Sequence, residues 1–191
     1  MLTAKYKDTG EELDITKFEN PRNEIDKERL VCKFCEGKIS IKDGKLRAKH
    51  FFHINNCTSD FERHAESPQH NLGKELIAQH IKEYWSEYSN AEIRFEYPIN
   101  EIKRIIDVAM LFPNGWIVAH EIQLSSITTE YLENRTNDYR KLGIDVFWWF
   151  GKSADKKANR EWAIEKYGQS LSINYELLDS KYKDLQKGKN I

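Results

Sequence analysis

The order of hydrophobic patterns between residues 68 and 150 limits the fold more than any other feature. Apolar side chains recur at helical spacing over about 68–88, directly after Ser67, a good N-cap, and Pro68, which suits the first helical position. Three strand-like runs follow at 93–97, 102–112 and 116–124, then a helical pattern at 127–142 and an apolar run at 144–150. Helices that alternate with strands in this way predict an α/β fold, with the last run as a buried central strand.

Two carboxylates interrupt the apolar strands of the predicted hairpin. Asp107 lies in IIDVAML and Glu121 in IVAHEIQL, and a carboxylate in such a run is costly to bury without a partner or a metal. If Pro113-Asn114-Gly115 is a three-residue loop, Asp107 and Glu121 face each other, with Gln123 on the same side as Glu121. A two-residue loop would break this register. Facing carboxylates suit a hard cation such as Mg²⁺; the alternative is a pair of exposed charges on an edge strand.

The cysteines and two of the histidines form a cluster with metal-ligand spacing. Cys32 and Cys35 form a C-x2-C pair, and His50, His53 and Cys57 follow within the same segment. This spacing is typical of a structural zinc site, and two of the three later residues would complete the four ligands. The alternative is two unrelated thiols and core histidines. A catalytic zinc is disfavoured because four protein ligands leave no open position. We therefore expect an N-terminal zinc-binding hairpin module over residues 1–60 and a second domain over 61–191.

A third polar group surrounds the start of the first predicted helix. His70 and Lys74 are four residues apart and share a helix face, and Glu66 comes just before the proposed cap. A carboxylate, an imidazole and an ammonium near a helix N-terminus suit a site for phosphate and metal. An ordinary solvated helix face is the alternative.

Overall charge gives no sign of nucleic-acid binding, since the formal net charge is only -1. A local basic strip is the exception, and it is either a DNA-gripping surface or a solvated hairpin. It comprises Lys42, Lys45, Arg47 and Lys49. The sequence has no run of about 18 apolar residues and no apolar segment typical of a secretion signal, so we expect a cytoplasmic protein with reduced thiols.

The motifs together resemble the competence protein CoiA-like family. The shared order is C-x2-C, H-F-x-H, E-S-x-x-H-x-x-x-K, an aspartate on a strand, and E-I-Q-x-S, and the resemblance runs from about residue 31 to 150. The positions are Cys32 and Cys35, His50 to His53, Glu66-Ser67 with His70 and Lys74, Asp107, and Glu121 to Ser125. This family is similar to PD-(D/E)XK nucleases, so the resemblance implies a restriction-endonuclease-like core of order αβββαβ with a mixed sheet.

The resemblance also implies roles for individual residues. Asp107 and Glu121 would hold Mg²⁺ or Mn²⁺, with Glu66 assisting, and Gln123 would occupy the place of the usual lysine. The expected activity is that of a Mg²⁺-dependent deoxyribonuclease in DNA uptake, recombination or defence, with a structural Zn²⁺. His70 and Lys74 would contact the phosphate. DNA is the expected partner, RNA is also compatible, and a protein partner in a DNA-processing or defence complex is a further expectation.

One departure from the nuclease pattern leaves an alternative open. Gln123 cannot act as a cationic stabiliser or as a base, as lysine could. Lys74 on the first helix is a candidate source of that charge. The alternative is a catalytically silent protein that keeps the nuclease fold and binds nucleic acid or scaffolds a complex.

Overall fold

The computed structural model describes residues 1–44, 47–61 and 66–186 of the chain. The chain divides into two compact units, Gly73–Asp179 and Met1–Leu72, the latter joined by the C-terminal segment from Ser180. Within the described ranges, no helix is both long and apolar enough to cross a membrane.

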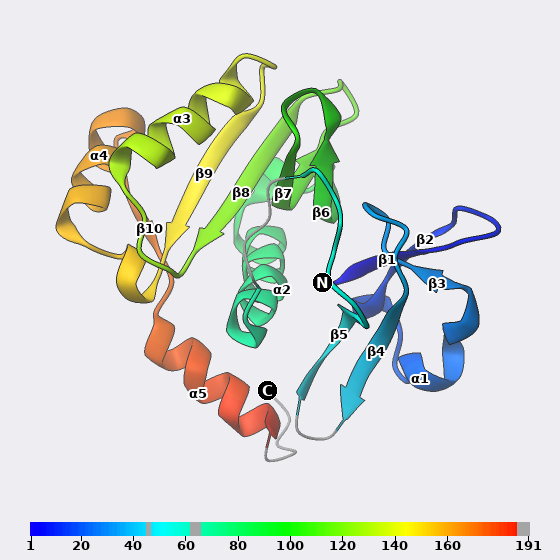
Figure 1. The fold of residues 1–191 in the computed structure, drawn as a ribbon. Helices are drawn as coiled ribbons and strands as arrows, with labels where there is room; N and C mark the ends of the chain where they lie inside the picture. The colour runs from blue at the N-terminus through cyan, green and yellow to red at the C-terminus, as the bar shows by residue number, and fades with distance from the viewer. Residues whose placement is uncertain (45–46, 62–65, 187–191) are drawn as a thin grey trace. The chain divides into compact units, whose positions relative to one another are not determined.

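The unit Gly73–Asp179 is built on a five-stranded mixed sheet of order β10-β9-β8-β7-β6 (Figure 1). Strands β6, β7 and β8 are antiparallel, whereas β8, β9 and β10 are parallel. The order helix, three strands, helix, strand agrees with the sequence pattern, and the α/β class with a mixed sheet is confirmed. The helices and strands from residue 68 onward are α2 (Pro68–Tyr84), β6 (Glu92–Ile99), β7 (Arg104–Leu111), β8 (Ile117–Gln123), α3 (Thr129–Arg140), β9 (Asp145–Phe150), α4 (Lys157–Tyr167), β10 (Leu171–Ser172) and α5 (Tyr175–Gln186), with short 3-10 turns at Ser86–Tyr88, Asn100–Ile102 and Lys152–Ala154. The first turn of α2 and the second half of α5 lie outside the bounds of this unit.

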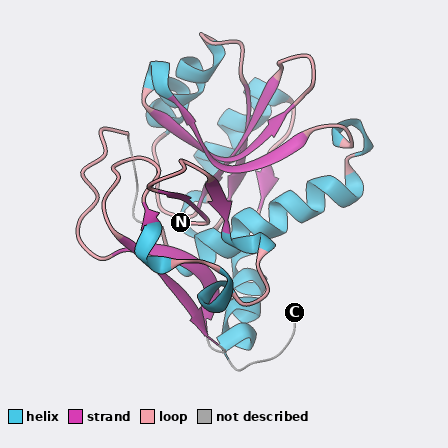
Figure 2. Ribbon diagram, turned by 90° about the vertical axis from the view of Figure 1, so that its right-hand side faces the viewer, coloured by secondary structure: helices cyan, strands magenta, loops and turns pink. Residues whose placement is uncertain are grey.

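Successive residues of β9 pack on opposite faces of the sheet, as expected for a strand. Trp148 donates its indole N–H to Thr136 of α3 at 3.0 Å. Trp149 instead stacks on Trp85, which directly follows α2, with ring centroids 6.0 Å apart. Both tryptophans of β9 are buried, as the buried strand predicted at 144–150 requires. Helix α3 therefore covers one face of the sheet, and the end of α2 lies on the other (Figure 2).

The predicted three-residue loop 113–115 joins β7 to β8. The backbone N–H of Phe112 donates to the carbonyl of Trp116 at 2.9 Å and closes the loop. Gly115 has φ of +84°, a left-handed conformation that glycine adopts without steric cost. The paired residues are Val108 with His120, Ala109 with Ala119, Met110 with Val118, and Leu111 with Ile117. All are symmetric about the centre of the loop, so the predicted register is confirmed.

The other unit contains a three-stranded antiparallel sheet of order β2-β1-β3 and a separate hairpin β4-β5. The elements are β1 (Thr3–Tyr6), β2 (Glu12–Asp14), α1 (Pro21–Glu24), β3 (Leu30–Val31), β4 (Ile39–Gly44) and β5 (Arg47–His53), with 3-10 turns at Ile15–Lys17 and Lys27–Arg29. The first 30 residues supply much of its core, including the fully buried Leu2 and Ile15. The division into domains 1–60 and 61–191 stays a prediction.

Candidate functional site

Asp107 and Glu121 lie on the adjacent strands β7 and β8. The register that pairs Val108 with His120 places these two carboxyl residues opposite each other, one step further along the hairpin. Oδ2 of Asp107 accepts a hydrogen bond from the backbone N–H of Ile122 at 2.9 Å. The hairpin thus brings both acidic residues of the predicted site to one place in the sheet.

Glu121 is buried under helix α3, with only 2% of its surface exposed. Its Oε2 lies 2.9 Å from a guanidinium nitrogen of Arg135, and its Oε1 accepts a hydrogen bond from the hydroxyl of Tyr139 at 2.5 Å. Burial raises the pKa of Glu121 to about 7; the negative charge of Asp107 adds to this shift, and Arg135 opposes it. The carboxyl group is therefore held by two hydrogen bonds in a position where its charge is costly.

The sequence pattern did not identify Arg135 or Tyr139 as partners of the acidic site. Both residues lie on α3 and are buried. They are four residues apart, the spacing at which helical side chains share a face. An arginine on the apolar stripe of a helix that follows an acidic strand is the signal that could have identified them.

Gln123 follows Glu121 by two residues on β8 and so projects from the same side of the strand. It is half-buried, and its amide N–H donates to the backbone carbonyl of Ser125 at 2.8 Å. The amide oxygen is then the atom that can face a cation or a water molecule. The position supplies an acceptor and no positive charge.

Lys74 does not lie on a solvated helix face. It is fully buried on α2, and its Nζ lies 2.8 Å from Oε1 of Glu96 on β6. Glu96 is 2% exposed and has a left-handed backbone with φ of 51°. Glu96 could not be identified from the sequence, because strand alternation in IRFEYPI gives no sign that this glutamate is buried.

Glu66 and His70 belong to the unit Met1–Leu72. The hydroxyl of Ser67 accepts a hydrogen bond from the backbone N–H of His70 at 3.1 Å, which confirms the predicted cap of α2. The carboxylate of Glu66 lies 3.1 Å from the amino group of Met1. The participation of Glu66 and His70 in the acidic site stays a prediction.

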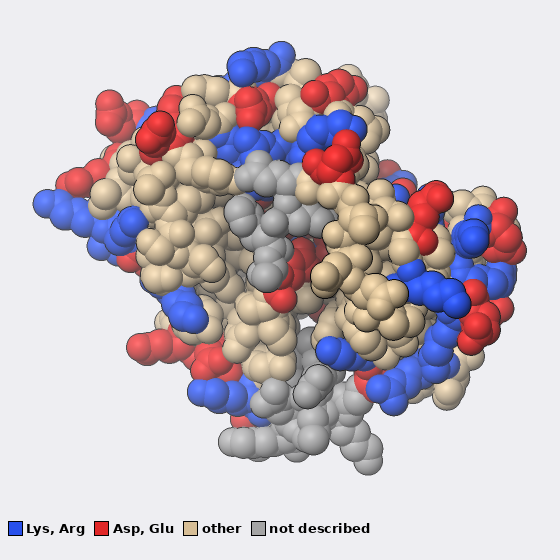
Figure 3. All heavy atoms as spheres, in the orientation of Figure 1, with Lys and Arg blue, Asp and Glu red and all other residues tan. Residues whose placement is uncertain are grey.

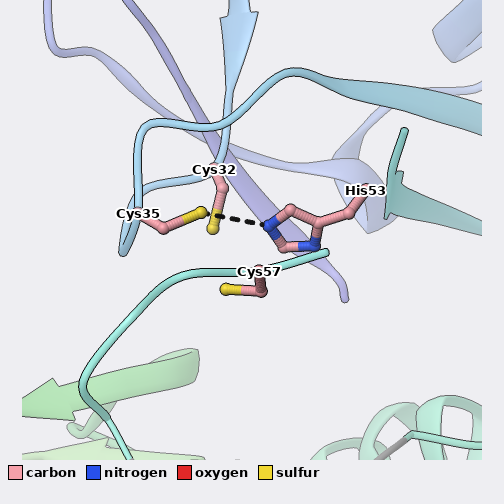
Figure 4. A group of neighbouring side chains, drawn as sticks. All are labelled: Cys32, Cys35, His53 and Cys57. Atoms are coloured by element: carbon pink, nitrogen blue, oxygen red, sulfur yellow. Dashed lines mark hydrogen bonds between the residues drawn. The ribbon is translucent and has the colours of Figure 1, made fainter. Parts of the chain in front are cut away.

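Four of the five predicted zinc ligands come together in the same unit (Figure 4). One ligand atom from each of Cys32, Cys35, His53 and Cys57 lies within 4.8 Å of the others. His50 is not in this group. It lies three residues before His53 on β5, and residues an odd number apart on a strand project to opposite sides. Of the three residues that could complete the four ligands, the structure therefore places His53 and Cys57, and not His50, beside the two cysteines.

The ligand atoms of this cluster lie close enough together to hold one metal ion. A turn begins at Cys32, whose Sγ accepts a hydrogen bond from the N–H of Phe34 at 3.4 Å. Sγ of Cys35 lies 3.3 Å from Nε2 of His53. Burial raises the pKa of Cys35, but a backbone hydrogen bond at Gly37 and further hydrogen bonds outweigh it, so the pKa is lowered. Sulfur and imidazole donors with a favoured thiolate are the ligand set that zinc prefers.

Two lysines of the predicted basic strip contact other residues of the chain. The ammonium of Lys42 lies 4.5 Å from the ring centroid of Phe52, and that of Lys49 donates to two backbone carbonyls at 2.9 Å and 2.6 Å. Lys45 and the side chain of Arg47 lie outside the described part of the chain. On the face drawn in Figure 3, lysines and arginines of the described residues are interspersed with aspartates and glutamates.

Residues 66–181 match the family model described as competence protein CoiA, nuclease-like domain. The chain belongs to the CoiA nuclease-like family. The resemblance inferred from the motifs is thereby confirmed. The competence protein CoiA of Bacillus subtilis (strain 168) is 27% identical over 133 residues, which cover 70% of this chain and 34% of that protein. The chain thus spans about a third of the length of this CoiA relative.

Among solved structures, the crystal structure of a repair endonuclease from Pyrococcus abyssi is similar over 58% of this chain and 49% of that chain, at 18% identity and a TM-score of 0.33. A TM-score at this level does not define a shared fold. The CoiA nuclease-like match itself contains Asp107 and Glu121, whereas the cysteine cluster lies before it.

Proposed function

We propose that this chain is a metal-dependent nuclease that hydrolyses phosphodiester bonds of DNA. The observation that carries the proposal is the placement of Asp107 and Glu121 opposite each other on β7 and β8, inside a nuclease-like domain. The pKa of Glu121, raised by burial and by Asp107, supports a functional role, because perturbed carboxyl groups concentrate at active sites. The order helix, three strands, helix, strand supports a restriction-endonuclease-like PD-(D/E)XK core.

The donor set fits Mg²⁺ or Mn²⁺, which prefer oxygen ligands. Each carboxylate oxygen of Glu121 accepts one hydrogen bond, and a carboxylate offers about four lone-pair positions, so capacity for a cation remains. Asp107 and Glu121 would hold the ion, and Glu66 is proposed to assist. When bound, such an ion lowers the pKa of water and stabilises charge on the phosphate.

The surrounding residues would orient the reacting groups. Arg135 and Tyr139 fix the carboxylate of Glu121 in one orientation, which favours a preorganised site. The amide oxygen of Gln123 would orient water or a metal-bound group. Lys74 would supply the positive charge that Gln123 lacks, and His70 is proposed to contact phosphate.

The cluster Cys32, Cys35, His53 and Cys57 is proposed to hold a structural zinc ion that stabilises the turn after β3. The zinc module would help to grip DNA through its basic strip, so binding would weaken as salt concentration rises. DNA uptake, recombination or defence in the cytoplasm, with a protein partner, is the proposed setting.

One observation favours a second candidate, a catalytically silent protein that binds nucleic acid or scaffolds a complex. The side chain of Gln123 has no positive charge, and the charge of Lys74 is neutralised by Glu96. A site without a net positive charge would still bind metal and DNA but would stabilise the transition state poorly.

Cleavage and binding assays distinguish these functions. Linear, circular and single-stranded DNA would be incubated with Mg²⁺, Mn²⁺ or EDTA, with wild type compared with Asp107→Ala, Glu121→Ala and the control Asp145→Asn, an exposed residue of β9. Metal-dependent cleavage that is lost in the first two variants and kept in the control supports the nuclease. Tight DNA binding by wild type without cleavage under any metal supports the silent protein instead.

A further inference from the structure

Glu96 adopts a left-handed backbone conformation in the middle of strand β6. Its φ is 51°, although both neighbouring residues pair regularly with β7. A residue with a Cβ atom rarely adopts this conformation, which strains the backbone. The other non-glycine residues of the described chain with positive φ lie outside strands; they are Glu36, Lys103 and Lys152. Strain inside a strand persists where the surroundings impose it, and such strain clusters at functional sites.

The side chain of Glu96 forms a buried ion pair with helix α2. Its Oε1 lies 2.8 Å from Nζ of Lys74, and the two side chains are 2% and 0% exposed. Removing two charges from water is costly, and an apolar pair of similar size often gives equal or greater stability. Stability alone therefore does not account for a buried ion pair that is accompanied by a strained backbone.

The ion pair lies beside the strand that carries Asp107. The two neighbours of Glu96 on β6 pair with the two neighbours of Asp107 on β7, so these residues stand opposite each other. On α2, Gly73 precedes Lys74, and a Cβ atom at Gly73 would lie 3.8 Å from Ile122 of β8. The N–H of Ile122 donates to Asp107. Helix α2 thus contacts β6 through the side chain of Lys74 and packs against β8 at Gly73. Strand β7, which lies between β6 and β8, carries Asp107.

On the basis of the proposed nuclease function, we propose that Glu96 is a positioning residue that acts through Lys74. It holds the ammonium group charged and fixed beside the strand of Asp107, where this charge replaces the one that Gln123 cannot provide. Burial alone favours a neutral amine, and a carboxylate partner reverses that preference.

The first test separates the charge of Glu96 from its shape. Glu96→Gln keeps the shape and removes the charge, and Glu96→Asp keeps the charge. Glu133→Gln is the matched control, because Glu133 pairs with Lys166 in the same unit. In DNA cleavage with Mn²⁺, we expect Glu96→Gln to lower kcat at least about tenfold with less than about a twofold change in KM. Glu96→Asp should recover most of kcat, and Glu133→Gln should match wild type.

A second test asks whether Glu96 acts through Lys74. Lys74→Met is compared with the double variant Lys74→Met/Glu96→Gln, which removes both buried charges and so avoids an unpaired one. If Glu96 acts through Lys74, adding Glu96→Gln to Lys74→Met changes kcat by less than about twofold. Losses that multiply in the double variant would overturn the proposal. So would a folded Glu96→Gln protein, verified by thermal melting, with the kcat of wild type.

Binding of Mn²⁺, followed by its electron paramagnetic resonance signal, distinguishes this proposal from the proposed function. A wild-type protein that neither binds Mn²⁺ nor cleaves DNA would refute the nuclease function and, with it, the role of Glu96. A wild-type protein that does both, combined with an unaltered Glu96→Gln variant, would refute the role of Glu96 alone.

Discussion

A guanidinium nitrogen of Arg135 lies 2.9 Å from Oε2 of Glu121, and this buried ion pair joins helix α3 to strand β8 at the candidate acidic site. Removing one partner of a buried pair typically costs about 3–5 kcal/mol, because the other charge stays buried. We expect Arg135→Met to lower the free energy of unfolding by about 3 kcal/mol in urea denaturation. Arg160→Met, at the partly exposed pair with Asp155, should lower it by less than about 1 kcal/mol. Equal losses in the two variants would contradict this interpretation.

The carboxyl group of Glu121 predicts a pH dependence of stability in the absence of divalent metal. Burial raises its pKa from 4.5 to about 7, so the folded protein holds this proton more tightly than the unfolded chain. Its contribution to stability is therefore complete below pH 4.5 and is lost as the pH rises to about 7. In EDTA, Glu121→Gln should remove this part of the pH dependence of the unfolding free energy. Parallel curves for the two proteins would contradict the prediction.

The imidazole of His120 predicts a pH dependence of stability with the opposite sign. It is fully buried and accepts a hydrogen bond from the indole of Trp149, and burial lowers its pKa from 6.5 to about 3. The unfolded chain then binds the proton more readily, so stability is full above pH 6.5 and falls as the pH falls toward 3. His120→Asn keeps an acceptor for Trp149 and should flatten the unfolding free energy over this interval. The same acid-side slope in wild type and variant would rule His120 out as its source.

The zinc cluster predicts which histidine matters for metal content. Purified protein should contain zinc, and His53→Ala should lose it, because His53 completes the group with the three cysteines. His50→Ala is the matched control and should keep the metal. Metal analysis combined with thermal melting measures both effects, and chelation should destabilise the wild type and the control. Loss of zinc in His50→Ala alone would show that the group is assigned wrongly.

Much of the unit Gly73–Asp179 could be predicted because its signals are local. The helix after Ser67 begins with a cap and a proline, and the β7–β8 hairpin has a loop that fixes its register. With a three-residue loop, Asp107 and Glu121 are the same number of residues from the loop centre, so they are expected to lie opposite each other. The cysteine spacing likewise predicted a metal cluster but not the choice between His50 and His53, which depends on the faces of β5.

The residues that escaped prediction depend on how distant elements pack. Arg135 and Tyr139 reach Glu121 only because α3 is rotated to face β8, and sequence spacing does not fix that rotation. Glu96 escaped for a different reason, since no residue pattern indicates a left-handed glutamate inside a strand. The burial of Lys74 depends on that same contact, and the alternative of a solvated helix face is wrong for this lysine, which is paired in the interior.

The most direct measurement is the rate of Mn²⁺-dependent cleavage of plasmid DNA by wild type, Asp107→Asn and Asp145→Asn, purified in parallel and shown to be folded. A metal-ligating Asp107 predicts that Asp107→Asn lowers the rate at least about a hundredfold, while Asp145→Asn, on the exposed end of β9, stays within about twofold of wild type. Equal cleavage by wild type and Asp107→Asn would show that the carboxylate on β7 does not support the reaction.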